Sequence, residues 1–498
     1  MASTLRGGHL IRLLDQWRAT RTAMGDGNGG TRNGNGGPGR RPEYATLAAA
    51  ISGLLRDGRV PIGVRLPAER ELAEGLGISR TTVTAAYREL RESGHLNSRR
   101  GAGSFTTLPA GQRVGSSGLW TPDDTGDMID LGCAALDAPA QLTDAVAAAV
   151  AELPRYTTGA GYHPSGLPAL RERIADAFTA RGLPTSPDQV LVTNGVQQAV
   201  DLILRLLVAP GQTALVESPT YPNALTALRA HRARIVTTNL DPAAGWEEEL
   251  LLAEVRSSRP TVAYLIPEFQ NPTGHVMPER LRALLPAAAH RAGTDLIVDE
   301  SFVDLAFDTP LPPPVASFDA HARVLTVGGV SKPYWGGVRV GWIRAATPLI
   351  ARLSALRVTV DMAGPVLDQL VAAAMLDRAS EVIAARRREL RARRDTLLAA
   401  LRQQIPQWTY VPPRGGVSLW VELDAPVSTA LAQAAHEHGV RLAPGSLFGP
   451  AGTLERFMRL PFTRPEPDLV EAVRRLAAAH ADLTRARPAA WAPPSLVA

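Results

Sequence analysis

The stretch Val330-Ser331-Lys332-Pro333 contains the one lysine of a chain of 498 residues that otherwise carries its positive charge on arginine. A guanidinium stays protonated at neutral pH, whereas a lysine amine can lose its proton and condense with an aldehyde. Lys332 is therefore a candidate for a Schiff base. The alternative is a surface lysine left over from a bias toward arginine, so the surrounding sequence has to distinguish the two.

Around Lys332, residues 128–485 alternate strand-like apolar runs with helical stretches rich in Ala, Leu and Arg. This alternation predicts α/β units around a largely parallel sheet. Asp299 follows the apolar run 296–298, which places it at the carboxyl end of a strand, where α/β folds carry their chemistry. A carboxylate there can pair with a protonated pyridine nitrogen. A helix-capping or salt-bridging aspartate is the alternative.

Other polar residues extend this set. Asn271 begins the turn sequence Asn-Pro-Thr-Gly, with its amide free to donate to a phenolate oxygen. Gly195 lies between a strand-like run and a helix, where backbone N–H groups can meet a phosphate, and Arg339 can add a cation. Arg459 follows another strand-like run and can clamp a carboxylate with two hydrogen bonds. Each residue, taken alone, fits a structural role at least as well.

Taken in order, these residues resemble the fold-type I aminotransferases over residues 128–485. The resemblance implies an α/β domain that binds pyridoxal 5′-phosphate, in which Lys332 forms the internal aldimine and Asp299 pairs with the pyridinium nitrogen. It also implies cofactor contacts from Asn271 to the phenolic oxygen, from Tyr221 by ring stacking, and from Gly195, Val196, Gln197, Ser331 and Arg339 to the phosphate. Arg459 corresponds to the clamp for a substrate carboxylate, and Tyr162 to a phosphate contact made across a dimer interface.

One position departs from this resemblance. The relatives usually carry a tyrosine two or three residues after the aspartate, and it donates to the same phenolic oxygen as the asparagine. This chain has Ser301 and Phe302 there. Serine can replace the lost donor only through a water molecule. We therefore expect cofactor binding to survive and leave transaminase turnover open.

Residues 40–107 form a basic module, with eleven arginines against seven acidic residues. The run 66–73, LPAERELA, predicts a helix with proline in its first turn, and residues 75–78 break it. Ser79 can cap a second helix with a polar, arginine-rich face. The run 99–105, RRGAGSF, predicts a glycine-tipped hairpin. Together these elements predict a winged helix-turn-helix that binds DNA, and a small protein-docking module is the alternative.

The basic module resembles the GntR-type DNA-binding domain in its order LPxERxLAxxLGxSRxTV followed by RxGxGxF. This resemblance implies DNA contacts from Arg70, Arg80, Thr81, Thr82, Arg99 and Gly103. A GntR-type winged helix before an aminotransferase-like domain resembles the MocR family of bacterial transcription regulators. That family implies a double-stranded DNA operator, an amino-compound effector that exchanges with Lys332, and a head-to-tail homodimer in which each DNA module packs near the other subunit's large domain.

Two alternatives to such a sensor stay open: an active aminotransferase that the DNA module merely tethers, and a regulator that senses pyridoxal phosphate itself. Residues 1–39 predict a short amphipathic helix and a Gly/Asn-rich linker, residues 108–127 a second linker, and residues 486–498 a tail. The single cysteine, Cys133, excludes an internal disulfide and fits a reducing compartment. We find no apolar run of spanning length, so we expect a cytoplasmic protein without a membrane partner, and no metal site.

Overall fold

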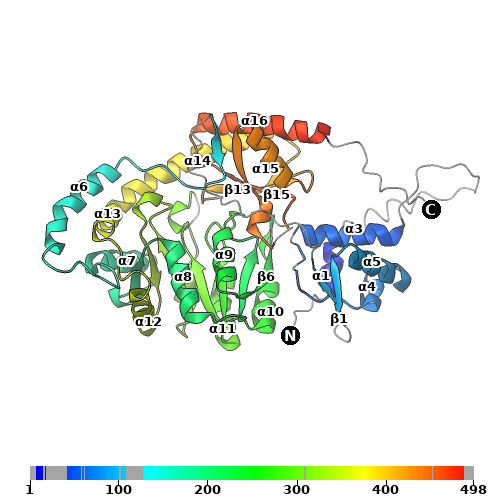
Figure 1. Cartoon of the computed structure of the whole chain (residues 1–498), viewed down its shortest axis with the longest axis horizontal. Coiled ribbons are helices and arrows are strands. Elements are labelled where there is room, and N and C mark those ends of the chain that lie inside the picture. The colour runs from blue at the N-terminus through cyan, green and yellow to red at the C-terminus, as the bar shows by residue number, and fades with distance from the viewer. Residues whose placement is uncertain are drawn as a thin grey trace, which may run out of the picture.

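The computed structural model describes residues 7–14, 17, 42–57, 59–60, 62–99, 103–107, 127–307, 310–450 and 453–486 (Figure 1). Residues 18–39 of the predicted first linker, residues 108–126 of the second and residues 487–498 of the tail lie outside this range. Among the described helices, none combines the length and the apolar character needed to cross a membrane.

The N-terminal domain is a winged helix-turn-helix, as predicted. Its elements are α1 (Gly7–Leu13), α3 (Glu43–Arg56), α4 (Glu69–Leu76), α5 (Arg80–Glu92), β1 (Leu96–Arg99) and β2 (Gly103–Thr106). Gly77 ends α4 with a φ of 65°, and the Ser79 hydroxyl caps α5 by accepting from Thr82 N at 3.0 Å. Tyr87 is buried and donates to Pro67 O at 2.9 Å, which ties α5 to the start of α4.

The short helix α1 packs on this domain. Leu10 and Leu14 are buried in the same hydrophobic core as α3, α4 and α5. A Cβ atom on Gly75 would clash with the Ile11 side chain, so glycine permits the close approach of α1 to α4. The predicted short amphipathic helix is therefore present, and it packs on the winged helix.

The large domain is built on an eight-stranded sheet. In spatial order its strands are β4 (Val190–Thr193), β11 (Gly341–Arg344), β10 (Val324–Gly329), β9 (Asp295–Asp299), β8 (Val262–Leu265), β5 (Thr213–Ser218), β6 (Arg234–Asp241) and β7 (Gly245–Trp246). The pairs β10–β9, β9–β8, β8–β5 and β5–β6 are parallel, whereas β11 and β7 run antiparallel to their neighbours. The prediction of a largely parallel sheet is confirmed.

Helices cover both faces of this sheet, because strand residues alternate between two hydrophobic cores. In β9, for example, Ile297 belongs to one core, and Leu296 and Val298 belong to the other. The helices are α6 (Leu142–Glu152), α7 (Pro168–Ala180), α8 (Val196–Leu207), α9 (Pro222–Ala230), α10 (Glu248–Ser258), α11 (Glu279–Ala292), α12 (Thr347–Val358), α13 (Val366–Asp377) and α14 (Ala379–Gln404). The fold class inferred from the sequence is confirmed.

A smaller five-stranded sheet lies above the large one in Figure 1, drawn mainly in orange and red. Its order is β12 (Thr409–Tyr410), β13 (Ser418–Glu422), β15 (Phe457–Pro461), β14 (Val440–Pro444) and β3 (Ile129–Leu131). The helices α15 (Ser428–Glu437) and α16 (Glu466–Ala486) pack with α14 beside it. β3 comes from the beginning of the large domain and pairs with β14 in parallel.

The winged helix contacts the rest of its own chain. Arg12 forms an ion pair with Glu247 at 3.3 Å, Asp57 pairs with Arg456 at 3.5 Å, and Leu454 N donates to Arg56 O. In the single chain the module therefore contacts residues just before α10 and just before β15. Packing against a second subunit stays a prediction.

Candidate functional site

The predicted cofactor residues converge because the central strands are parallel and end at one edge of the sheet. Asp299 ends β9 beside Val327 of β10, and Lys332 follows the end of β10. Asn271, Tyr221 and Gly195 follow β8, β5 and β4 in the same way. β11 is antiparallel, so its first residue lies at this edge and brings the preceding Arg339 next to Gly195.

The Lys332 amine lies in a half-buried position and donates to Ala134 O at 2.8 Å. Burial lowers the pKa of Lys332, and the nearby Arg459 lowers it further, while Cys133 and Asp299 partly offset the shift. A lowered pKa increases the fraction of neutral amine, the form that attacks an aldehyde. The ring centroid of Phe302 lies 5.8 Å from Nζ, so an apolar aromatic face stands where the resemblance implied a tyrosine hydroxyl.

Asp299 is buried and accepts three hydrogen bonds. Tyr264 Oη donates at 2.6 Å, Ser301 N at 2.9 Å and Ser301 Oγ at 2.5 Å. Burial raises the pKa of Asp299, and these donors together with Lys332 oppose the rise. The Ser301 hydroxyl thus supports the carboxylate, in contrast to the water-mediated role considered from the sequence. Sequence reasoning missed Tyr264, whose signal is a phenol inside an otherwise apolar strand.

An anion cradle forms where α8 begins. Gly195 caps this helix with a φ of 80°, and a Cβ there would lie 3.2 Å from Nη2 of Arg339. Arg339 Nη2 donates to Asn194 O at 3.3 Å, and the Asn194 and Gln198 side-chain amides donate to Asp361 at 2.8 and 2.5 Å. A helix N-terminus with a guanidinium beside it is suited to a phosphate.

Asn271 and Gln197 are both predicted to contact the cofactor. Each has a buried side-chain oxygen, Oδ1 and Oε1 respectively, that has no hydrogen-bond partner among the described residues. The turn at Asn271 is held by Gln270, which donates to Pro219 O at 2.8 Å and to Glu217 at 3.0 Å. Both atoms are carbonyl oxygens and lack a donor that the described part of the chain could supply. With the anion cradle, the buried carboxylate and the lysine, the residues fit pyridoxal phosphate.

Arg459 lies in the middle of β15 and is 6% exposed. Its guanidinium donates to Gly132 O and lies 5.0 Å from the ring of Phe448, while its Nε has no described partner. Burial lowers the pKa of Arg459 to about 10. No carboxylate among the described residues pairs with it, so a buried cation is left without a counter-charge.

For three of the residues predicted to bind the cofactor, no described contact tests that role. Tyr162 is 62% exposed, and no described bond joins it to the cofactor residues of its own chain. Ser331 is half-buried beside Lys332. Val196 begins α8 next to the cradle. Among the described residues, no cluster of three or more His, Cys, Asp or Glu side chains is suited to a metal ion.

The predicted DNA contacts lie on α4, α5 and the wing. Arg80 and Thr81 are exposed at the start of α5, whereas Thr82 is half-buried and its hydroxyl lies 2.8 Å from Ser79 Oγ. The Arg70 side chain is 83% exposed, and its ion-pair partner among the described residues is Glu74, one turn away on the same helix. These side chains can turn toward a phosphate at little cost, because exposed ion pairs are weak.

The wing is the hairpin of β1 and β2, in which Arg99 pairs with Gly103. The Arg99 side chain lies outside the described residues. Gly103 has a φ of 104°, and a Cβ there would lie 2.6 Å from Nε of Arg65. Sequence reasoning missed Arg65, which is exposed and presents a further guanidinium at the wing.

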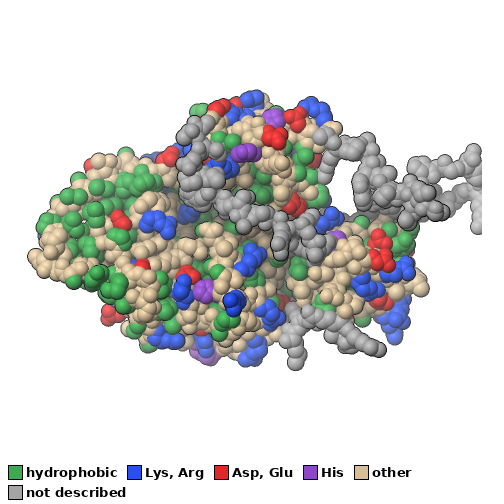
Figure 2. Space-filling view, in the orientation of Figure 1, with side chains coloured by type: hydrophobic (Ala, Val, Ile, Leu, Met, Phe, Trp, Pro, Cys, Tyr) green, Lys and Arg blue, Asp and Glu red, His purple; other side chains and the backbone are tan. Residues whose placement is uncertain are grey.

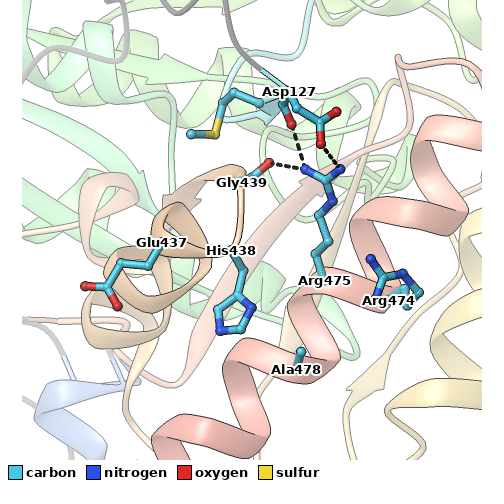
Figure 3. A pocket seen from close by; sticks show the side chains of 8 residues that line it. Asp127, Glu437, His438, Gly439, Arg474, Arg475 and Ala478 are labelled. Carbon is cyan, nitrogen blue, oxygen red and sulfur yellow. Dashed lines mark hydrogen bonds and ion pairs between the residues drawn. The ribbon is translucent and has the colours of Figure 1, made fainter.

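An open cavity of about 490 Å³ lies elsewhere, where the chain enters the large domain (Figure 3). Arg475 crosses it, holding the Asp127 carboxylate at 2.5 Å and donating to Asp127 O at 2.6 Å and Gly439 O at 3.3 Å. The Arg475 guanidinium thus pairs with the Asp127 carboxylate across the cavity and anchors the first residue of the large domain.

Known proteins match both parts of the chain. Residues 126–476 match the family "aminotransferase class I and II", and residues 43–106 match "bacterial regulatory proteins, gntR family". The HTH-type transcriptional regulator TauR of Rhodobacter capsulatus is 29% identical over 87% of this chain and 95% of its own length. Aromatic-amino-acid aminotransferase 1 of Thermococcus litoralis is 32% identical over 65% of this chain and 79% of its own.

A solved structure shows the same likeness for the large domain. The α-aminoadipate aminotransferase LysN of Thermus thermophilus, complexed with N-(5′-phosphopyridoxyl)-L-leucine, superposes with a TM-score of 0.66 at 28% identity, covering 72% of this chain and 93% of that one. The chain is a transcriptional regulator with an aminotransferase-like domain: it belongs to the aminotransferase class I and II family and, through its gntR-family winged helix, to the MocR-type regulators.

Proposed function

We propose that this regulator binds pyridoxal phosphate at Lys332 and senses an amino compound that also carries a carboxylate. When bound, the cofactor supplies an aldehyde carbon that exchanges one amine for another. Lys332 contributes the amine of the resting state, and its lowered pKa favours the reactive neutral form. Asp299 holds the proton on the ring nitrogen, while Arg339 and the start of α8 hold the phosphate.

The observation that carries this proposal is the unpaired guanidinium of Arg459. A buried arginine without an acidic partner costs several kcal/mol in general, so its retention calls for an anion that binds part of the time. A backbone carbonyl, Gly132 O, accepts from it in the chain alone. A carboxylate on the effector satisfies both Nε and Nη2 in the bidentate geometry that arginine favours.

A homodimer is supported by the surface of the large domain. Figure 2 shows hydrophobic side chains gathered over the end of the molecule where Figure 1 places α6, α7, α12 and α13. Exposed hydrophobic residues of these elements are Val146 (40%) and Val150 (54%) on α6 and Met362 (46%) between α12 and α13. The exposed Tyr162 would be available to contact the phosphate cradle of a second copy, as the resemblance to aminotransferases implies. Two winged helices in one dimer read two half-sites on DNA.

The active aminotransferase remains the second candidate, because Asp299, Asn271 and Arg459 keep the positions that turnover needs. Phe302 weighs against it, since no hydroxyl lies beside Lys332 in its place. Because the partner of the winged helix is chromosomal DNA, we place the protein in the cytoplasm.

The visible spectrum of the cofactor-loaded protein, titrated with amino acids and amines, tests the proposal. A lasting shift of the cofactor band, together with changed affinity for duplexes selected from a random library, is the result expected of a sensor. Release of an oxo acid as the band decays identifies a catalyst. If no amino compound shifts the band and adding the cofactor alone changes DNA affinity, the cofactor is the signal.

A further inference from the structure

The segment Asp127–Ala134 connects the part of the chain that leads from the winged helix with the cofactor site. Its first residue directly follows residues 108–126, through which the chain leads from the winged helix, and Arg475 anchors it there (Figure 3). Its last three residues reach the cofactor site, where Ala134 O accepts from Lys332 and Gly132 O accepts from Arg459. Only a few residues thus separate the connection to the DNA module from both functional cations.

The turn that presents these two carbonyls is held by Asp130. Its Oδ1 accepts from Gly132 N at 2.7 Å and from Cys133 N at 3.3 Å, and its Oδ2 pairs with Arg441 at 3.4 Å. The packing is tight, because a Cβ on Gly132 would lie 3.1 Å from Oδ1 of Asp130 and 3.4 Å from Arg441. Asp130 and Arg441 therefore act on the site through the backbone of residues 132–134.

The cofactor and the effector would compete with these two carbonyls for their hydrogen-bond donors, Lys332 and Arg459. A carbonyl oxygen carries only a partial charge, so a carboxylate is the stronger acceptor for the Arg459 guanidinium. Once the cofactor engages the Lys332 nitrogen, Ala134 O loses its donor as well. The cofactor therefore removes the bond to Ala134 O, and the carboxylate of an effector, whose amine takes the place of Lys332, removes the bond to Gly132 O.

We propose that Asp127–Ala134 is a latch that reports occupancy of the site to the DNA module, with Asp130 and Arg441 as its positioning residues. The proposal rests on the sensor function proposed above. In the empty site the latch is closed on Lys332 and Arg459. Ligand binding opens it, and the movement is passed to Asp127 along β3, the edge strand of the small sheet in the described part of the chain.

The chain carries its own reporter for this movement. Cys133 lies between the two carbonyls and is the single cysteine, so a thiol reagent reads the latch alone. It is half-buried, and burial raises the pKa of the Cys133 thiol while Lys332 and Arg459 oppose the rise. Because changes at Asp130 also alter this pKa, labelling rates are compared on the plateau above the thiol pKa, where only accessibility counts.

The test measures maleimide labelling of the full-length protein with and without stoichiometric pyridoxal phosphate. Wild-type protein is expected to label several-fold faster once the cofactor is bound. Asp130→Ala is expected to label about tenfold faster without cofactor, as loss of one or two hydrogen bonds to a charged group implies. Asp130→Asn keeps an acceptor for Gly132 N and is expected to restore most of the slow rate.

Asp468→Ala is the matched control, because Asp468 pairs with Arg464 on the same domain without touching the latch. Equal rates for Asp130→Ala and Asp468→Ala, with no response of wild-type protein to the cofactor, would overturn the latch. If Asp130→Ala does not fold, the wild-type cofactor response and Arg441→Gln decide the matter.

The same samples keep the two proposals apart. The cofactor band reports binding of an amino compound, and so tests the sensor, whatever the thiol does. A band that shifts with no change in labelling rate overturns the latch and leaves the sensor in place. A band that never shifts overturns the sensor, and the rate in Asp130→Ala still decides whether the latch exists.

Discussion

The winged helix and the large domain differ in where they place the arginines that we expect to bind anions: at the surface in the first and in the interior in the second. On the winged helix, Arg70 and Arg80 are exposed, and the described partner of Arg70 is a glutamate on its own helix. In the large domain, Arg459 is buried against a backbone carbonyl and an aromatic ring. A long polyanion can be met by loosely held surface cations, whereas a small anion has to find a cation that is desolvated and fixed beforehand.

Replacing Lys332 separates the two surfaces most sharply. Lys332→Ala is expected to abolish the visible cofactor band and every response to amino compounds, because the chain has no other ε-amine. Affinity for duplex DNA is expected to stay within about twofold, since no described contact joins Lys332 to the winged helix. Lys332→Arg is the charge-matched control and is expected to behave like alanine. A persistent band in either variant contradicts the assignment.

Replacing Arg459 removes the fixed cation and leaves the amine. Arg459→Ala is expected to weaken an effector that carries a carboxylate by about 2–5 kcal/mol, a loss of roughly 30-fold or more. A matched amine without the carboxylate is expected to shift the cofactor band equally in both proteins. Arg459→Lys keeps the charge but cannot form two parallel hydrogen bonds to a carboxylate, so its loss of effector affinity is expected to be intermediate. Isothermal titration of loaded protein measures these differences, and equal losses for both ligands would refute the clamp.

Replacing Arg80 tests the exposed surface. Arg80→Ala is expected to weaken DNA binding by about 1–3 kcal/mol if the arginine reads a base, or to reduce the salt slope by about one if it contacts a phosphate. Cofactor spectra are expected to be unchanged. Fluorescence anisotropy at several salt concentrations distinguishes the two modes. An unaltered affinity and slope would remove Arg80 from the interface.

The smallest expected effect concerns pH. Because the pKa of Lys332 is lowered from 10.5, more of its amine is neutral at pH 8 than in a free lysine. The rate of cofactor capture by the empty protein is therefore expected to rise with pH and to level off below pH 10.5. Stopped-flow absorbance, with N-acetyl-lysine as the reference amine, measures both curves. Coinciding curves would show that burial has no effect on this amine.

Local sequence determined most of what could be predicted. The turn between α4 and α5 depends on Gly77 and Ser79, and both act within three residues of themselves. The position of Asp299 follows from one apolar run, because the end of a parallel strand is fixed by that run. The fold and Asp299 were accessible for this reason, whereas Lys332 stood out as the single lysine of the chain.

The contacts that support the site and the wing could not be predicted from the sequence in the same way. Tyr264 reaches Asp299 from the neighbouring strand, and Arg441 reaches Asp130 from the other end of the large domain. Arg65 meets the wing only because the hairpin folds back on it. Each of these pairs needs a tertiary arrangement that no spacing along the chain specifies, and the closeness of Cys133 to Lys332 has the same origin.

The replacement of lysine by arginine across the surface has a chemical consequence for the whole molecule. Aldehydes in solution form imines with exposed ε-amines at random, and most proteins offer dozens of them. This chain offers one, inside the site. Borohydride treatment should fix a single pyridoxyl group to the lysine side chains of each polypeptide, so that occupancy can be counted by mass, without background from scattered adducts.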